Sequence, residues 1–282
     1  MQVHIALLIS TVCQRLGLGL FIFSVLANQF MGVILPIDII AVISLGLLGF
    51  GGLASAFHLG KPTRFFNAFS NFKSHLTQEA LVTPFLGIAL LVCILDGFLF
   101  DLGNGAVMMH WVTVALSLLF LITTGLVYQL SARPAWDTGL VLIIFMLTAA
   151  QVGSISTMVA AYVFTSSVSV SLTVVTILMF VLSMFAQYLY IQRLKTLEYG
   201  VAVNVISKPY NVTFITWLIF GVLTVAISLI FVAMQWQGAM VLTAFGAIAS
   251  VIGIFAWTVL FFKTAIKVKM FPMYDVDLNL YF

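Results

Sequence analysis

The feature that most constrains this chain is a series of long, continuous apolar stretches. Eight of them lie at roughly residues 5–27, 35–57, 79–99, 107–130, 138–163, 168–192, 211–234 and 239–263. Each is close to the ~20 residues that an α-helix needs to cross a bilayer. The mean hydropathy is +1.23, and only 7% of the residues are charged. These values exclude an ordinary soluble domain.

Backbone groups inside lipid cannot bond to water, so only helices and closed barrels span a membrane. The apolar stretches are continuous rather than alternating, which argues against barrel strands. We therefore predict an all-α integral membrane protein, an eight-helix bundle with both termini on the same side, formed by residues 1–275 as one domain. The ending "NLYF" is similar to part of a protease-cleavage linker, so residues 276–282 are treated as a separate tail. No clear sequence repeat marks two halves, although an even number of spans permits one.

Basic residues gather on one side of the predicted bundle. Except for Arg15, every lysine and arginine lies at or after the end of an even-numbered span: Lys61, Arg64, Lys73, Arg133, Arg193, Lys195, Lys208, Lys263, Lys267 and Lys269. Such bases set orientation and contact membrane lipids. The positive-inside rule places both termini, and the loop from His58 to Glu79, in the cytoplasm. The net charge of +3 gives no sign of nucleic-acid binding.

The loop "FHLGKPTRFFNAFSNFKSHLTQEA" concentrates polar side chains in an otherwise apolar chain. His58 ends the second span, and Glu79 begins the third span on the same face. A quinone needs an apolar cleft for its ring and tail and proton-exchanging partners for its oxygens. Imidazole and carboxylate groups supply that exchange. Alternatively, His58 only caps one helix and Glu79 only favours the N-terminus of the next.

Arg15 is the one base predicted deep within a span. Charges there are costly and usually face a partner or a cavity. We expect Arg15 to approach the quinone pocket, to pair with backbone carbonyls, or to snorkel toward the membrane surface. The "GLGL" that follows it, and Gly46, Gly49, Gly51 and Gly52 of the second span, are expected to let neighbouring helices approach. Gln151, Ser154, Ser156 and Gln187 are expected to form hydrogen bonds between helices.

Residue types also argue against a resident metal or haem. Cys13 and Cys93 form no CxxC motif, so cysteine cannot build an iron–sulfur or zinc site here. His110 lies on the face opposite His58, and His75 is placed in the loop. His4 and His58 are then the only histidine pair on one side. We expect no metal site and no haem.

The segment "HLGKPTRFFNAFSNFKSHLTQE" resembles the signature of the membrane-anchor subunits of dimethyl sulfoxide reductase-type complexes, including the related sulfite dehydrogenase anchors. The residues that carry the resemblance are His58, Leu59, Gly60, Pro62, Arg64, Asn67, Ala68, Ser74, Leu76, Thr77 and Glu79. Length and span count fit over the whole chain. "RPAWDTG", at residues 133–139, is similar to a loop in the corresponding place.

This resemblance implies an anchor in the bacterial inner membrane that is not catalytic alone. It implies two partners, a four-cluster iron–sulfur subunit and a molybdopterin catalytic subunit, which would hold the molybdopterin and the clusters. The anchor would exchange electrons with menaquinone or ubiquinone, with menaquinol oxidation expected. The essential histidine and glutamate fall on His58 and Glu79, and supporting positions fall on Gly60, Arg64 and Phe66.

Three alternatives stay open. In the best-known family members the histidine-bearing face lies outside the cytoplasm, whereas the charge pattern places it inside. A cytoplasm-facing anchor of the sulfite dehydrogenase type, which reduces quinone, satisfies both the motif and the charges. A small-solute transporter would use Arg15, Gln151 and Gln187 along its path. A haem-containing quinol oxidoreductase would need a histidine pair.

Overall fold

The computed structural model describes residues 5–58, 71–99, 102–197 and 211–264, without the side chains of Phe57, His58 and Asn104. Its elements are α1 (Ile5–Phe30), α2 (Ile37–His58), α3 (His75–Phe98), α4 (Asn104–Val127), α5 (Leu140–Thr165), α6 (Val170–Thr196), α8 (Val212–Thr216), η2 (Trp217–Thr224), α9 (Val225–Ala233) and α10 (Ala239–Lys263). The segments α8, η2 and α9 form one span, so the described residues contain eight helices able to cross a membrane. The predicted eight-helix membrane fold is confirmed.

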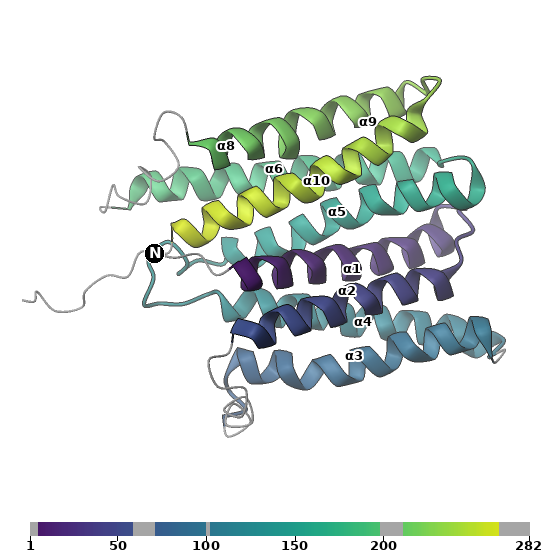
Figure 1. Cartoon of the computed structure of the whole chain (residues 1–282), viewed down its shortest axis with the longest axis horizontal. Helices are drawn as coiled ribbons and strands as arrows, with labels where there is room; N and C mark the ends of the chain where they lie inside the picture. Colours follow the sequence, from purple (N-terminus) through teal and green to yellow (C-terminus); the bar gives the residue numbers. More distant parts are fainter. Residues whose placement is uncertain (1–4, 59–70, 100–101, 198–210, 265–282) are drawn as a thin grey trace, which may run out of the picture.

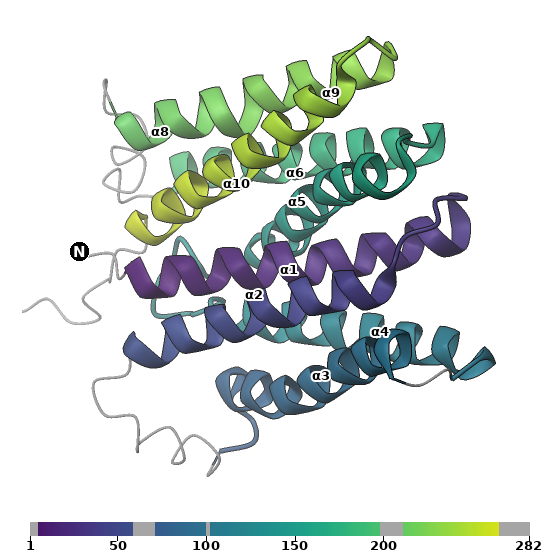
Figure 2. The ribbon, with the colours of Figure 1, turned by 45° about the vertical axis from the view of Figure 1, so that its right-hand side comes forward.

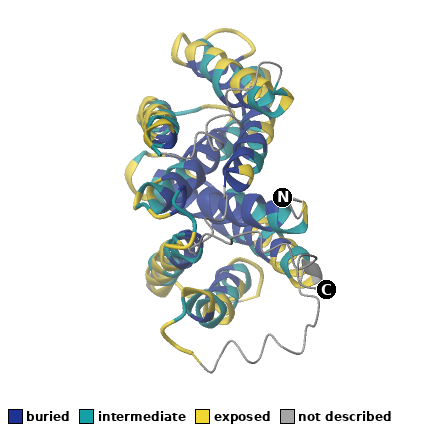
Figure 3. Cartoon of the chain, turned by 90° about the vertical axis from the view of Figure 1, so that its left-hand side faces the viewer, coloured by how far each residue is buried: buried dark blue, intermediate teal, exposed yellow. Residues whose placement is uncertain are grey.

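The helix axes lie roughly parallel to one another, with α1 and α5 at the centre of the bundle (Figure 1, Figure 2). In the most apolar window of each span, 67% of α1 and 61% of α5 is buried, against 22–44% elsewhere. Figure 3 looks along the bundle and places the buried residues in the middle and the exposed ones outside. The beginning of α1, the end of α2 and the end of α10 lie at one end of the bundle, which we call the His58 end. Which side of the membrane this end faces stays a prediction.

The contacts between helices repeat in two groups of four. In the first group α1 packs on α2, α2 on α3, α3 on α4, and α4 on α1. The second group repeats the pattern with α5, α6, the α8–α9 span and α10. The groups meet through α1 and α5, and also through α4 with α5 and α10 with α1. The tertiary structure therefore has a twofold repeat of contacts that the sequence does not display.

Small residues allow the central helices to touch. A Cβ atom on Gly19 of α1 would overlap the carbonyl oxygen of Ala149, and one on Gly153 would overlap the backbone of Gly19. The close approach predicted at "GLGL" is therefore confirmed. Gly51 also contacts α1, where an added Cβ would lie 3.1 Å from the Ser10 oxygen.

The prediction for the other glycines of α2 was wrong. Gly46, Gly49 and Gly52 have nothing within 4 Å of an added Cβ. They lie on a helix face that no described neighbour covers. A glycine permits a close contact but does not require one, because the packing of the other helices decides which face of α2 is covered.

The third span begins one turn earlier than its apolar residues suggest. Ser74 has an extended backbone before the helix, and the Asn71 side chain accepts a hydrogen bond from the Lys73 N–H at 3.1 Å. Asparagine and serine favour such turns and helix starts. His75 is therefore the first residue of α3 and not part of the loop, which corrects the prediction. Glu79 consequently lies in the second turn of α3 instead of at its beginning.

Only some of the polar side chains within the helices form the expected hydrogen bonds between helices. Trp217 of η2 donates to the Gln187 side chain of α6 at 2.8 Å, so the predicted interhelical bond is confirmed there. Ser154 donates to the carbonyl of Gln151 within its own helix, and the Gln151 amide has no hydrogen-bond partner within the described residues. For those two side chains the prediction was wrong. Ser156 stays a prediction.

Candidate functional site

The structure places the predicted site residues only in part. His58 is the last residue of α2, and its side chain is not described. Gly60, Arg64 and Phe66 lie outside the described residues, as does the tail at 276–282. Glu79 and Arg15 are described in full, and they define a site at the His58 end of the bundle.

Glu79 points from α3 toward α4. Its side chain is half-buried and lies within reach of the hydroxyl of Thr124 in α4. The same hydroxyl lies 2.9 Å from the Phe120 carbonyl oxygen, to which it can donate. A hydroxyl has one proton to donate and can also accept. An ionised Glu79 would therefore accept from Thr124, whereas a protonated Glu79 would donate to Thr124 and leave the bond to Phe120 in place. The site can hold this carboxyl in either protonation state.

Tyr128 links Glu79 to Arg15 electrostatically. It follows the last residue of α4 and lies one turn beyond Thr124. Burial is the largest cause that raises the pKa of the Tyr128 phenol; the charge of Glu79 raises it further, and the charge of Arg15 lowers it. Such charge effects weaken with distance. Both charged groups are therefore near one phenol, although they come from helices far apart in the sequence.

Arg15 is 2% exposed and joins three helices. Its Nε donates to the Thr11 carbonyl at 2.9 Å, and its terminal nitrogens donate to the hydroxyls of Thr148 in α5 at 3.0 Å and Thr258 in α10 at 2.7 Å. Its Cζ lies 4.8 Å from the centroid of the Phe145 ring. Because these partners are neutral, none of them cancels the positive charge of the guanidinium. The expected bond from Arg15 to a backbone carbonyl is confirmed. An approach of Arg15 to the quinone pocket stays a prediction.

An aromatic cluster closes the site on the side of α5 and α10. The Tyr128 ring stacks on Phe145 with centroids 5.1 Å apart and meets the edge of Trp136 at 5.7 Å. Trp136 belongs to the "RPAWDTG" loop, and its indole N–H donates to the Phe261 carbonyl at 3.2 Å. Arg133 of the same loop lies over the Trp136 ring at 4.8 Å. The loop is therefore fixed against the bundle beside the site.

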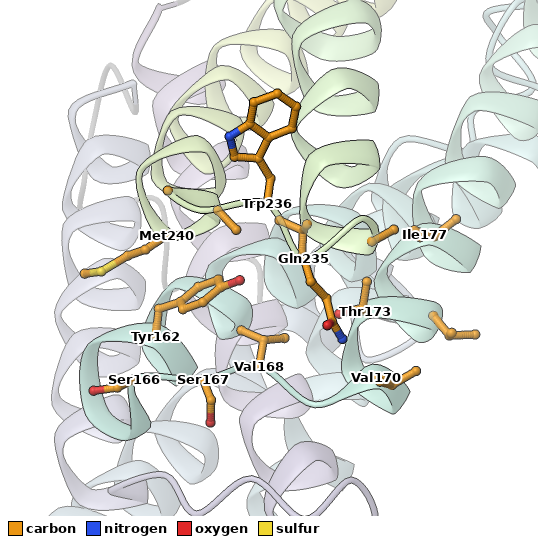
Figure 4. Close-up of a pocket in the computed structure, with 15 residues that line it drawn as sticks. Tyr162, Ser166, Ser167, Val168, Val170, Thr173, Ile177, Gln235, Trp236 and Met240 are labelled. Carbon is orange, nitrogen blue, oxygen red and sulfur yellow. The ribbon is translucent and has the colours of Figure 1, made fainter.

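A larger cavity than any at the candidate site lies between other helices. It has a volume of about 650 Å³ and lies between the α5–α6 and α9–α10 connections, at the end opposite His58. Figure 4 shows Tyr162, Gln235 and Trp236 around it. Its lining contains no charged side chain and none of the predicted site residues. Size alone therefore does not locate the quinone chemistry, which requires groups that exchange protons.

Sequence reasoning missed Thr124, Tyr128, Phe145, Thr148 and Thr258. Threonine is frequent in the apolar spans, and most of its hydroxyls bond to their own helix, so no single threonine stands out. The one available signal was the spacing of Thr124 and Tyr128. They lie four residues apart, on one helix face, at the end of a span that finishes beside the basic residues.

Comparison with known proteins found a family model and a curated relative that match this chain. Residues 1–264 match the family model described as "DMSO reductase anchor subunit (DmsC)". A curated relative is the C subunit of the anaerobic dimethyl sulfoxide reductase of Haemophilus influenzae, strain ATCC 51907 / DSM 11121 / KW20 / Rd. It is 32% identical over 109 residues, which cover 37% of this chain and 38% of the relative. The match thus spans well under half of that relative's length.

Proposed function

Because this chain belongs to the DMSO reductase anchor subunit family, we propose that it is the quinone-reactive membrane anchor of a molybdenum and iron–sulfur oxidoreductase complex. In this proposal the anchor oxidises quinol, menaquinol rather than ubiquinol, and the ring reacts at the His58 end of the bundle. The supporting observation is the position of Glu79. Its carboxyl is half-buried beside Thr124, and it acts on the same phenol, Tyr128, as the buried Arg15.

The chemistry follows from these groups. Oxidation of one quinol releases two protons and two electrons. The His58 imidazole would take one proton and the Glu79 carboxylate the other. On gaining its proton, Glu79 would change from accepting the Thr124 hydrogen bond to donating it. The positive charge of Arg15 favours the negative charge that develops on a quinol oxygen as its proton leaves.

The two electrons would leave through partner subunits. We propose that a four-cluster iron–sulfur subunit docks at the His58 end and passes electrons to a molybdopterin catalytic subunit. The basic residues described at this end, among them Lys73, Arg133 and Arg193, suit contact with a protein surface or with lipid head groups. The complex would lie in the bacterial inner membrane. Gly60, Arg64 and Phe66 remain proposed parts of the quinone pocket.

A second candidate function reverses the direction of electron flow. The same carboxyl, imidazole and guanidinium groups would also serve a quinone-reducing anchor of a cytoplasm-facing complex of the sulfite dehydrogenase type. The charge pattern favours that orientation, because every described base except Arg15 lies at the His58 end. The transporter alternative has less support, because Gln187 is engaged with Trp217 and Arg15 with two threonines.

The test compares His58→Ala and Glu79→Gln in the assembled complex. We expect both to keep the partner subunits at the membrane and to lower quinol turnover by about 10²-fold or more, as loss of a proton acceptor does. Reduction of substrate by a viologen dye, which feeds the partner subunits directly, should not change. Asp96→Asn is the matched control, because Asp96 lies at the opposite end of the bundle near the end of α3. Full quinol turnover in Glu79→Gln would refute the proposed site.

A further inference from the structure

A second cavity lies one helical turn from the candidate site. It is a groove of about 370 Å³ between α1, α4 and α5. Its lining includes Gly19 and Leu26 of α1, Trp111 and Leu121 of α4, and Met146 and Ala150 of α5. Apart from the indole N–H of Trp111, no lining side chain carries a polar atom. Its volume falls within the roughly 300–1,000 Å³ of small-molecule sites.

The spacing of residues along all three helices places this groove next to the candidate site. Gly19 follows Arg15 by four residues, Ala149 follows Phe145 by four, and Leu121 precedes Thr124 by three. Residues three or four apart share a helix face. Because α4 runs opposite to α1 and α5, each of these steps leads away from the His58 end and into the membrane. The groove therefore begins where the polar groups end.

The groove is long and open to lipid along part of its course. From Leu121 to Trp111 the lining of α4 spans eleven residues, about 15 Å of helix. Leu118, one turn from the Leu121 end, is 36% exposed. Near the far end Trp111 meets the Phe30 ring of α1, with centroids 5.8 Å apart. A flexible chain could enter from the bilayer and lie along the groove.

We propose that this groove holds the isoprenoid tail of the quinone whose ring reacts at Glu79, an inference that rests on the proposed function. An apolar chain could also belong to a phospholipid. The polar end of the groove argues for a quinone. A quinol hydroxyl can donate to the Glu79 carboxylate, which repels a phosphate. The Arg15 guanidinium, which would attract a phosphate, is buried and already donates to three oxygens of the protein. The occupant is thus a polyprenyl chain attached to a neutral ring that exchanges protons.

The first test fills the groove and varies the tail. Ala150→Phe adds bulk to the lining, and Val163→Phe is the matched control, because Val163 is on the same helix, is 57% exposed and does not line the groove. The complex is assayed with a polyprenyl naphthoquinol and with the same ring carrying only a methyl group. In Ala150→Phe we expect KM for the polyprenyl quinol to rise at least about tenfold, since excluding two buried methylene groups already costs that factor. KM for the methyl compound should not change.

The outcomes separate this inference from the proposed function. If Ala150→Phe uses both quinols as the wild type does, the groove holds no quinone tail and the inference fails, while the anchor still oxidises quinol. If the wild-type complex oxidises neither compound, the proposed function itself fails. Equal loss of both quinols in Ala150→Phe would also contradict a role confined to the tail.

The second test needs no variant. A quinone that carries a photoreactive diazirine on its prenyl chain is irradiated with the wild-type complex in liposomes. We expect labelled peptides from α1, α4 and α5, and we expect excess unlabelled polyprenyl quinone, but not excess phospholipid, to suppress the labelling. Labelling of other helices, or suppression by phospholipid alone, would overturn the inference and assign the groove to bilayer lipid.

Discussion

Replacing Thr258 by valine removes a hydroxyl that holds the buried Arg15 and leaves the shape of the side chain nearly unchanged. The Thr258 oxygen accepts the shortest of the three Arg15 hydrogen bonds, at 2.7 Å, while its own proton goes to the Ile254 carbonyl. Both residues are no more than 2% exposed. Their burial keeps bulk water from replacing the lost oxygen.

The expected loss of stability follows from two measured ranges of hydrogen-bond free energy. A hydrogen bond to a charged group contributes about 1.5–3 kcal/mol in soluble proteins. Hydrogen bonds between membrane helices average only about 0.6 kcal/mol, with a maximum near 1.7. Because the Arg15 donor is charged and buried, we expect the upper end of the membrane range. Thr258→Val should lower the free energy of unfolding by about 1.5 kcal/mol.

The assay is reversible unfolding of the purified anchor in mixed detergent micelles. Thr176→Val is the matched control, because Thr176 is also buried but donates only to the Leu172 carbonyl of its own helix. It should lose clearly less stability than Thr258→Val. In an Arg15→Met background the cost of Thr258→Val should largely vanish, because the charged donor is absent. A cost that persists in that background, or that equals the cost of Thr176→Val, would refute the reasoning.

Two further predictions concern the contact between α1 and α5 and the candidate site. Gly19→Ala should destabilise the bundle, because the added Cβ would overlap the Ala149 carbonyl. Gly46→Ala should be neutral or stabilising, because its Cβ meets nothing and the change removes a glycine from a helix. Unfolding in micelles compares the two variants, and equal effects would contradict the close contact at Gly19. Tyr128→Phe should keep the stacking on Phe145 and lower quinol turnover by up to about 10²-fold, if the phenol helps proton transfer as Glu79 does. Unchanged turnover would mean that this ring only packs.

Much of the fold could be predicted because lipid removes the alternatives. The eight spans follow from length and hydropathy, since the backbone must satisfy its own hydrogen bonds inside a bilayer. The apolar pattern misplaces the first residue of α3, because His75 and Gln78 are polar and polar residues between apolar stretches indicate a loop. The local signal at Asn71 and Ser74 competes with that polarity and decides where the helix starts.

The candidate site was only half predictable. Glu79 and Arg15 stood out because charge is rare and costly within an apolar span. Thr124, Thr148 and Thr258 did not, because a threonine hydroxyl can always bond to its own helix and only the neighbouring helix gives it a second role. Thr258 lies 243 residues from Arg15, and nothing local connects them.

By itself, the sequence determined that this chain is a membrane bundle with eight helices and a concentration of polar groups after the second span. The tertiary structure decided which helices touch, that the contacts repeat in two groups, and that Arg15 and Glu79, from helices far apart in the sequence, both lie near Tyr128. The physical reason lies in the solvent. In water the buried face of a helix can be recognised because it is apolar, but in lipid both faces are apolar. Gly46 and Gly19 illustrate this, because a Cβ on Gly46 would meet no atom whereas one on Gly19 would overlap Ala149. Which face is buried then depends on how side chains of all the helices fit together.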